Sequence, residues 1–201
     1  MECLLGIQGK DFVILAGDTV SSRSIMKMKS DQDKIFKIGS RMMMAAVGQA
    51  GDTVMFTELI GKNLQLYKMK NGYEMSLHAA VNFTRRILAE MLRSQKPKMV
   101  NLLMAGVDEG GPALYFIDYI ATMVKLPFAV HGYGGMFTMS ILDKYYKPGM
   151  QRTEALNLLK MCMNEIQTRF VIDTPRFMVR VVTAKGVEDL GLVDPKAKGT
   201  I

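Results

Sequence analysis

Residues 34–47 read Lys-Ile-Phe-Lys-Ile-Gly-Ser-Arg-Met-Met-Met-Ala-Ala-Val, and this stretch decides how the rest of the chain is interpreted. A turn at residues 39–41 separates two short apolar runs, which predicts a β-hairpin. Side chains alternate along a strand, so the three methionines at 42–44 cannot all face the same side. At least one must point toward a second apolar layer. The second run is therefore typical of a strand that is covered on both faces.

Short apolar runs around turn residues recur along the chain, and two regions change to a three- and four-residue apolar spacing. Strands are expected at residues 3–8, 11–16, 34–38, 42–47, 100–107, 113–118, near 128, 177–183 and 187–190. Helices are expected at residues 52–71, 76–96, 136–145 and 153–170. Hairpins at successive turns imply antiparallel sheets with helices packed outside, so the class is α+β. Periodicity alone does not distinguish two stacked sheets from a single helix-covered sheet.

Length and composition place the chain among ordinary globular domains. It has 201 residues, of which 49% are hydrophobic and 22% charged, and a chain of this size buries roughly 70% of its surface on folding. No proline- or serine-rich linker divides it, so we expect a single domain over residues 1–201. Residues 192–201 are polar and are expected to form a C-terminal tail that contacts a neighbouring protein.

The charges and motifs argue against several functions. The net charge of +7 is scattered along the chain, whereas nucleic-acid-binding faces concentrate basic and aromatic residues. The glycines of residues 132–135 lack the spacing of a dinucleotide-binding loop, and no phosphate-binding loop motif occurs. His78 and His131 share no local spacing with other metal ligands. No run of eighteen apolar residues occurs. We therefore expect no cofactor, no metal, no nucleic-acid partner and no membrane partner.

Several short motifs, taken in order, resemble proteasome β-type subunits, and the resemblance covers essentially the whole chain. Each motif is weak alone, but their order and spacing together are specific. They are Leu15-Ala16-Gly17-Asp18, residues 33–38, Gly48-Gln49-Ala50-Gly51-Asp52-Thr53, residues 103–108 with 111–118, and His131-Gly132-Tyr133-Gly134. The resemblance implies a four-layer αββα sandwich, in which two antiparallel sheets are flanked by helix pairs, as in N-terminal-nucleophile hydrolases.

Active members of that family use an N-terminal threonine, whose hydroxyl needs a base to take its proton. A lysine and an aspartate tune that nucleophile electrostatically, and Lys34 and Asp18 match them. The nucleophile's own position, however, falls at Glu2, and a carboxylate cannot replace a terminal hydroxyl. The resemblance thus implies that Lys34 and Asp18 are structural, as an ion pair.

The remaining catalytic positions of the family also differ. The serine of the glycine turn corresponds to Tyr133, and the aspartate and serine after the long helix correspond to Phe170 and Asp173. The only Gly-Thr dipeptide, Gly199-Thr200, lies at the wrong end to release a threonine. We therefore expect no catalytic residue in this chain, which would be a non-catalytic subunit of a threonine-protease complex.

One catalytic alternative stays open: Cys3, after trimming of two residues, could act as a terminal thiol nucleophile, although its apolar neighbours favour a buried strand position. The expected partners are unlike β subunits of a seven-membered ring, with beta-3 and beta-5 as neighbours, an α ring and the opposing β ring. The expected role is in ubiquitin-dependent protein degradation in the cytoplasm and nucleus. Cys3 and Cys162 are too isolated for a disulfide framework, which suits a reducing compartment.

Overall fold

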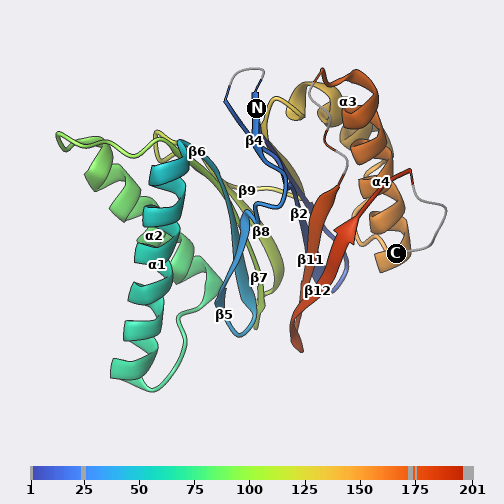
Figure 1. Cartoon of the computed structure of the whole chain (residues 1–201). Coiled ribbons are helices and arrows are strands. Elements are labelled where there is room, and N and C mark those ends of the chain that lie inside the picture. The colour runs from blue at the N-terminus through green and yellow to red at the C-terminus, as the bar shows by residue number, and fades with distance from the viewer. Residues whose placement is uncertain (1, 24–25, 172–173, 175, 197–201) are drawn as a thin grey trace.

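The computed structural model describes residues 2–23, 26–171, 174 and 176–196, and Figure 1 shows their arrangement. One sheet has the order β10-β1-β2-β11-β12, with bounds β1 (Cys3–Gln8), β2 (Phe12–Asp18), β10 (Phe128–Gly132), β11 (Phe177–Thr183) and β12 (Gly186–Val193). The other has the order β5-β6-β7-β8-β9, with bounds β5 (Ile35–Gly39), β6 (Met42–Gly48), β7 (Val100–Asp108), β8 (Gly111–Ile117) and β9 (Met123–Lys125). A small hairpin joins β3 (Ser21–Arg23) to β4 (Met26–Lys29).

Helix pairs cover the two outer faces of the stacked sheets. The helices are α1 (Ala50–Asn71), α2 (Leu77–Leu92), α3 (Gly135–Tyr145) and α4 (Arg152–Arg169). In Figure 1, α1 and α2 lie outside the sheet that contains β5, while α3 and α4 lie outside the sheet that contains β11. Every described strand pair is antiparallel. The expected α+β class and its four-layer form are confirmed, and the single-sheet alternative is wrong.

Three apolar clusters fill the spaces between these layers. One lies between the sheets and includes Leu4, Leu15 and Leu114. A second packs α1 and α2 against β6, β7 and β8, and a third packs α3 and α4 against β1, β2 and β11. The fold therefore buries both faces of its central strands, which explains their continuous apolar runs.

The three consecutive methionines divide between two of these clusters, as strand alternation requires. Met43 points into the core between the sheets, whereas Met42 and Met44 point into the core under α1 and α2. All three are buried. The sequence prediction that at least one of them reaches a second apolar layer is confirmed.

The end of helix α2 and the end of strand β12 differ from the predictions. Helix α2 ends at Leu92 rather than near Lys96, because the Ser94 hydroxyl donates to the Met91 carbonyl and accepts from the Lys96 amide. Strand β12 runs past the expected Leu190 to Val193, which is buried and pairs with Phe177. The expected tail over residues 192–201 therefore starts two residues too early, and its residues 197–201 lie outside the described residues.

Strands β3, β4 and β9 have no counterpart among the predictions. Each has only three or four residues, and all four residues of β4 are exposed. A strand without a buried face shows no alternation of apolar and polar residues. Their sequences therefore carried no periodic signal.

We expect Met43→Ala to lower the free energy of unfolding by about 2–5 kcal/mol, because it leaves a cavity between the sheets. The matched control is Met69→Ala, at a methionine of α1 that is 71% exposed, with an expected change within about 0.5 kcal/mol. Urea unfolding of the purified full chain measures both. Equal effects would contradict the placement of Met43 in the central core.

Candidate functional site

A buried ion pair joins the two sheets at one end of the sandwich. Asp18 ends β2 in one sheet, and Lys34 immediately precedes β5 in the other. The Lys34 ammonium lies 2.9 Å from both carboxylate oxygens of Asp18, and both residues are at most 2% exposed. The Lys34 carbonyl also accepts from the Ala46 amide at 3.0 Å, which places Lys34 in the ladder with β6. The ion pair inferred from the resemblance is therefore present.

Backbone groups satisfy the remaining hydrogen-bonding capacity of this pair. The Lys34 ammonium donates to the Val20 carbonyl at 2.8 Å. The Asp18 carboxylate accepts from the Cys3 amide at 2.7 Å and from the Val20 amide at 3.1 Å. A buried ion pair is tolerated only when its remaining donors and acceptors are satisfied in this way. The pair thus fixes β1, β2 and the start of β5 relative to one another.

Glu2 occupies the space next to this pair. One of its carboxylate oxygens accepts from the Gly48 amide at 2.9 Å, and the other lies 3.6 Å from the Lys34 ammonium. An ionised carboxylate only accepts hydrogen bonds and has no proton for a base to remove. Held between a backbone N–H and an ammonium, the Glu2 side chain accepts these contacts and has no proton to give up in an attack on a carbonyl. It shares the Lys34 ammonium with Asp18.

Gly48 is the site residue whose importance the sequence analysis did not recognise. Its φ is +147°, and a Cβ there would lie 2.1 Å from the Met99 carbonyl oxygen. Only glycine therefore fits where β6 turns into α1 and presents its amide to Glu2. The available signal was its place between a buried strand and a helix start, where glycine often allows a close backbone approach.

Cys3 does not have the environment of a nucleophile. Its thiol is buried in the core under α3 and α4, so close to Gly134 that a Cβ there would lie 2.2 Å from Sγ. Burial, reinforced by the nearby Asp18 carboxylate, raises the pKa of the Cys3 thiol well above its usual range. The thiol therefore stays protonated at neutral pH, and the thiolate is the nucleophilic form. This geometry does not favour the catalytic alternative.

The other positions compared with active subunits serve packing or face solvent. Tyr133 lies between β10 and α3 and is 56% exposed. Phe170 caps α4 and packs edge-on against Phe137, with ring centroids 6.0 Å apart. Asp173 lies outside the described residues. The structure therefore brings Glu2, Lys34 and Asp18 together. Tyr133 follows Gly132, which packs against the Glu2 backbone, but neither Tyr133 nor Phe170 has a described hydrogen bond or ion pair with these three residues.

The two histidines lie in unrelated environments. His131 is buried, stacks on Phe116 with ring centroids 4.0 Å apart, and places Nε2 3.0 Å from the Leu102 carbonyl. Burial lowers the pKa of His131 to about 4. His78 is exposed beside Asn82 and Tyr115. Within the described residues, no group of three His, Cys, Asp or Glu side chains could hold a metal ion, and no helix could span a membrane.

Comparisons with known proteins agree with this geometry. The family described as "Proteasome subunit" matches residues 2–182. The chain is 44% identical to "Proteasome subunit beta type-2-B" of Arabidopsis thaliana over 95% of its length and 96% of the relative. It is 42% identical to "Probable proteasome subunit beta type-4" of Neurospora crassa, with 98% of both chains covered. It is 40% identical to "Proteasome subunit beta type-4" of Saccharomyces cerevisiae, over 94% of its length and 97% of the relative.

Removing the cation of the buried pair should be costly. We expect Lys34→Met to lower the free energy of unfolding by about 3–5 kcal/mol, because it leaves the Asp18 carboxylate buried and uncompensated. Adding Asp18→Asn to Lys34→Met should restore part of the loss. Lys37→Met, at an exposed lysine of β5, should change stability by less than about 0.5 kcal/mol. Urea unfolding tests the series, and a mild Lys34→Met would refute the structural role of the pair.

The lowered pKa of His131 predicts acid sensitivity. An unfolded histidine takes up a proton near pH 6.5, whereas the folded chain resists protonation until about pH 4. The stabilisation is therefore complete above pH 6.5 and is lost as the pH falls toward 4, by about 2–3 kcal/mol at pH 4.5.

The measurement is the unfolding free energy of the wild type and two variants at pH 7 and pH 4.5. His131→Asn should lose less stability than the wild type over this interval, and the difference should equal the histidine contribution. His78→Asn, at the exposed histidine, should behave as the wild type does. Parallel pH profiles for His131→Asn and wild type would show that His131 is not held neutral.

Proposed function

The chain belongs to the proteasome subunit family, and from this premise we propose that it is a non-catalytic structural β subunit of the 20S core particle. Residues 1–9 and 63–74 resemble the matching stretches of one subgroup, the eukaryotic fourth β subunit, also called proteasome subunit beta type-2, and the names of the relatives agree with it. In this role the chain forms part of the β ring that encloses the proteolytic chamber, where its sister subunits cleave peptides in ubiquitin-dependent degradation.

The observation that carries the proposal is the Glu2 carboxylate beside the Lys34–Asp18 pair. Nucleophilic catalysis at a chain terminus needs a hydroxyl or thiol that a nearby base can deprotonate. At this place the chain has an acceptor-only group that is already bound to Lys34 and Gly48. The nearest thiol, Cys3, is buried and protonated. The chain retains the electrostatic scaffold, and neither Glu2 nor Cys3 offers a group that could react there.

Both outer faces of the sandwich support a role in assembly. Exposed apolar side chains lie on α1, and others lie on α3 and α4: Met55, Leu66 and Met69 on the first face, and Met136, Met139 and Met161 on the second. Apolar side chains gathered on an exposed face are typical of protein interfaces. The proposed partners are the beta-3 and beta-5 neighbours in the ring, the α ring and the opposing β ring.

The proposed location is the cytoplasm and nucleus. Both cysteines are free and buried, which fits a compartment that keeps thiols reduced.

The test exposes the assembled particle to an electrophilic peptide that traps terminal nucleophiles, followed by intact mass spectrometry of each subunit. We expect adducts on sister subunits, which serve as the positive control, and none on this chain, because the Glu2 carboxylate has no proton for a base to remove and the Cys3 thiol is buried and protonated. Cys3→Ala should leave the peptidase activity of the particle unchanged. A covalent adduct on the first residue of a trimmed form of this chain, or loss of one activity in Cys3→Ala, would overturn the proposal.

A further inference from the structure

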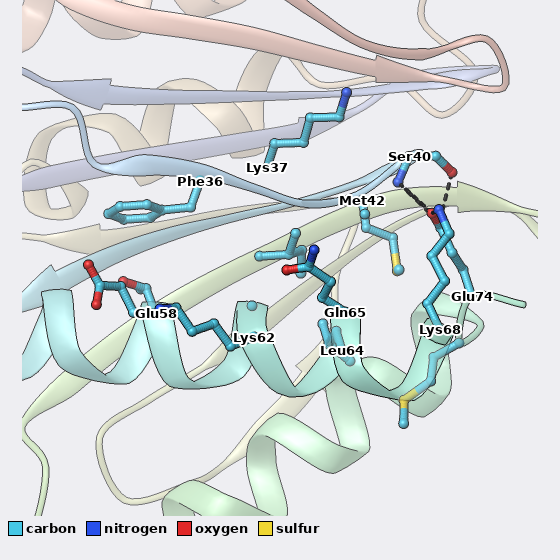
Figure 2. Close-up of a pocket in the computed structure, with 15 residues that line it drawn as sticks. Phe36, Lys37, Ser40, Met42, Glu58, Lys62, Leu64, Gln65, Lys68 and Glu74 are labelled. Atoms are coloured by element: carbon cyan, nitrogen blue, oxygen red, sulfur yellow. Dashed lines mark hydrogen bonds and ion pairs between the residues drawn. The ribbon is translucent and has the colours of Figure 1, made fainter. Parts of the chain in front are cut away.

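A groove of about 600 Å³ runs between strand β5 and helix α1 (Figure 2), and its lining includes none of Glu2, Lys34, Asp18 and Gly48. Its apolar lining residues come from β5, β6, α1 and the loop before α2: Phe36, Ile38, Met42, Leu64 and Met75. Leu64 and Met42 are buried, and the other three are partly buried. The groove therefore offers an apolar floor with polar rims.

The free edge of β5 forms one wall of this groove. Within the described residues, β5 lies at the end of its sheet and pairs only with β6. The bond from the Ala46 amide to the Lys34 carbonyl sets the register, so the backbone groups of Ile35 and Lys37 turn away from β6. Those of Ile35 are already bound, because its amide donates to Asp33 and its carbonyl accepts from Arg180. The Lys37 backbone, among the residues 36–40 that line the groove, is therefore the part of this edge that suits pairing with an extended segment.

Gly61 forms part of the opposite wall, and the chain's own packing does not account for it. It lies in the interior of α1, where glycine is less favourable than alanine. A Cβ at this position would have no atom within 4 Å, and its φ is not in the left-handed region. Alanine would therefore fit the folded chain without a clash. The missing side chain widens the groove on the side that faces β5, which suits the close approach of another chain.

The charged groups at the two ends of the groove differ in whether they already have partners. At one end, Glu74 accepts from the Ser40 amide, the Ser40 hydroxyl and the Lys68 ammonium (Figure 2), so these groups are already satisfied. Lys37 extends from β5 away from α1. Next to Gly61, the exposed Lys62 has no ion pair with any described residue. The carboxylate nearest to it on α1, Glu58, lies one turn earlier and does not pair with it.

We propose that this groove binds an extended segment of a neighbouring proteasome subunit, which pairs with the Lys37 backbone of β5, packs an apolar side chain against Gly61 and the groove floor, and places a carboxylate beside Lys62. Three features meet here: the outward-facing Lys37 backbone, a glycine that the fold itself does not need, and an ammonium without an ion pair to a described residue. The inference rests on the proposed assembly into the particle, and it assigns a binding surface within that assembly.

The test co-expresses wild-type and variant chains, distinguished by mass, with the other subunits of the particle, and measures their ratio in the purified particle. Gly61→Ala should raise the urea midpoint of the isolated chain and yet be under-represented in the particle by at least about threefold. Its control, Gly51→Ala, lies at the start of α1, where a Cβ also meets nothing within 4 Å. Gly51→Ala should enter the particle as the wild type does.

Charge reversal tests the second contact. Lys62→Glu should be under-represented, whereas Lys70→Glu, at an exposed lysine of α1 outside the groove, should be incorporated normally. Hydrogen exchange should show that the backbone amide of Lys37 is more protected in the particle than in the free chain.

The outcomes separate this inference from the proposed function. Failure of the wild-type chain itself to enter the particle would overturn both. Normal entry of the wild type and of Gly61→Ala and Lys62→Glu alike, with no added protection of the Lys37 amide, would overturn the groove assignment and leave the structural role intact.

Discussion

The ion pair between Lys34 and Asp18 is the interaction on which the arrangement of the two sheets depends. Charges buried this deeply are stable only when they are paired and fully hydrogen-bonded, so the segments that supply those bonds must be placed together. Here they are β1, through the Cys3 amide, the Val20 segment after β2, and the start of β5. Apolar packing holds the layers together without fixing their relative position, whereas this directional network permits one alignment at this end of the sandwich.

The same network explains why the fold persists without the reaction that it supports in active relatives. An aspartate and a lysine placed to tune a nucleophile are also a pair that needs its partners in order to be stable. Glu2 adds a second carboxylate near the Lys34 ammonium and binds the amide of Gly48. The Lys34 ammonium is thus shared by two carboxylates, and the Gly48 amide supplies the hydrogen bond that holds the second one. The resemblance identified Lys34 and Asp18, but the bond between Glu2 and Gly48 joins residues 46 positions apart, and nothing in local sequence predicts it.

The fold was predictable where burial imposes a regular spacing on the apolar residues of a helix or strand. The strands with two buried faces and the helices with apolar stripes were recognised because hydrophobicity decides their positions. The sequence could not indicate β4, whose residues are all exposed, or the end of α2, which depends on the Ser94 side chain. The groove beside β5 was also beyond sequence reasoning, because it depends on an absent side chain at Gly61 and on a strand edge whose neighbours only the folded chain defines.

The methionine triplet has a consequence for how β6 finds its alignment with β7. The strand continues as Met42-Met43-Met44-Ala45-Ala46, so sliding it by one position would exchange like for like at positions 42, 43 and 45 and would still place an apolar residue at 44 and 46. A slip normally fails because it turns apolar side chains toward solvent, but here both faces are buried and apolar, so the pattern barely separates the native register from the slipped one. The ends of the strand must therefore select the native register. Near one end of β6, Met42 lies opposite Gly106, where a Cβ would lie 2.8 Å from the Arg41 carbonyl oxygen. At the other end, a Cβ at Gly48 would approach the Met99 carbonyl oxygen even more closely. A slipped pairing would bring residues with side chains to these two points, so steric exclusion at the ends selects the native alignment.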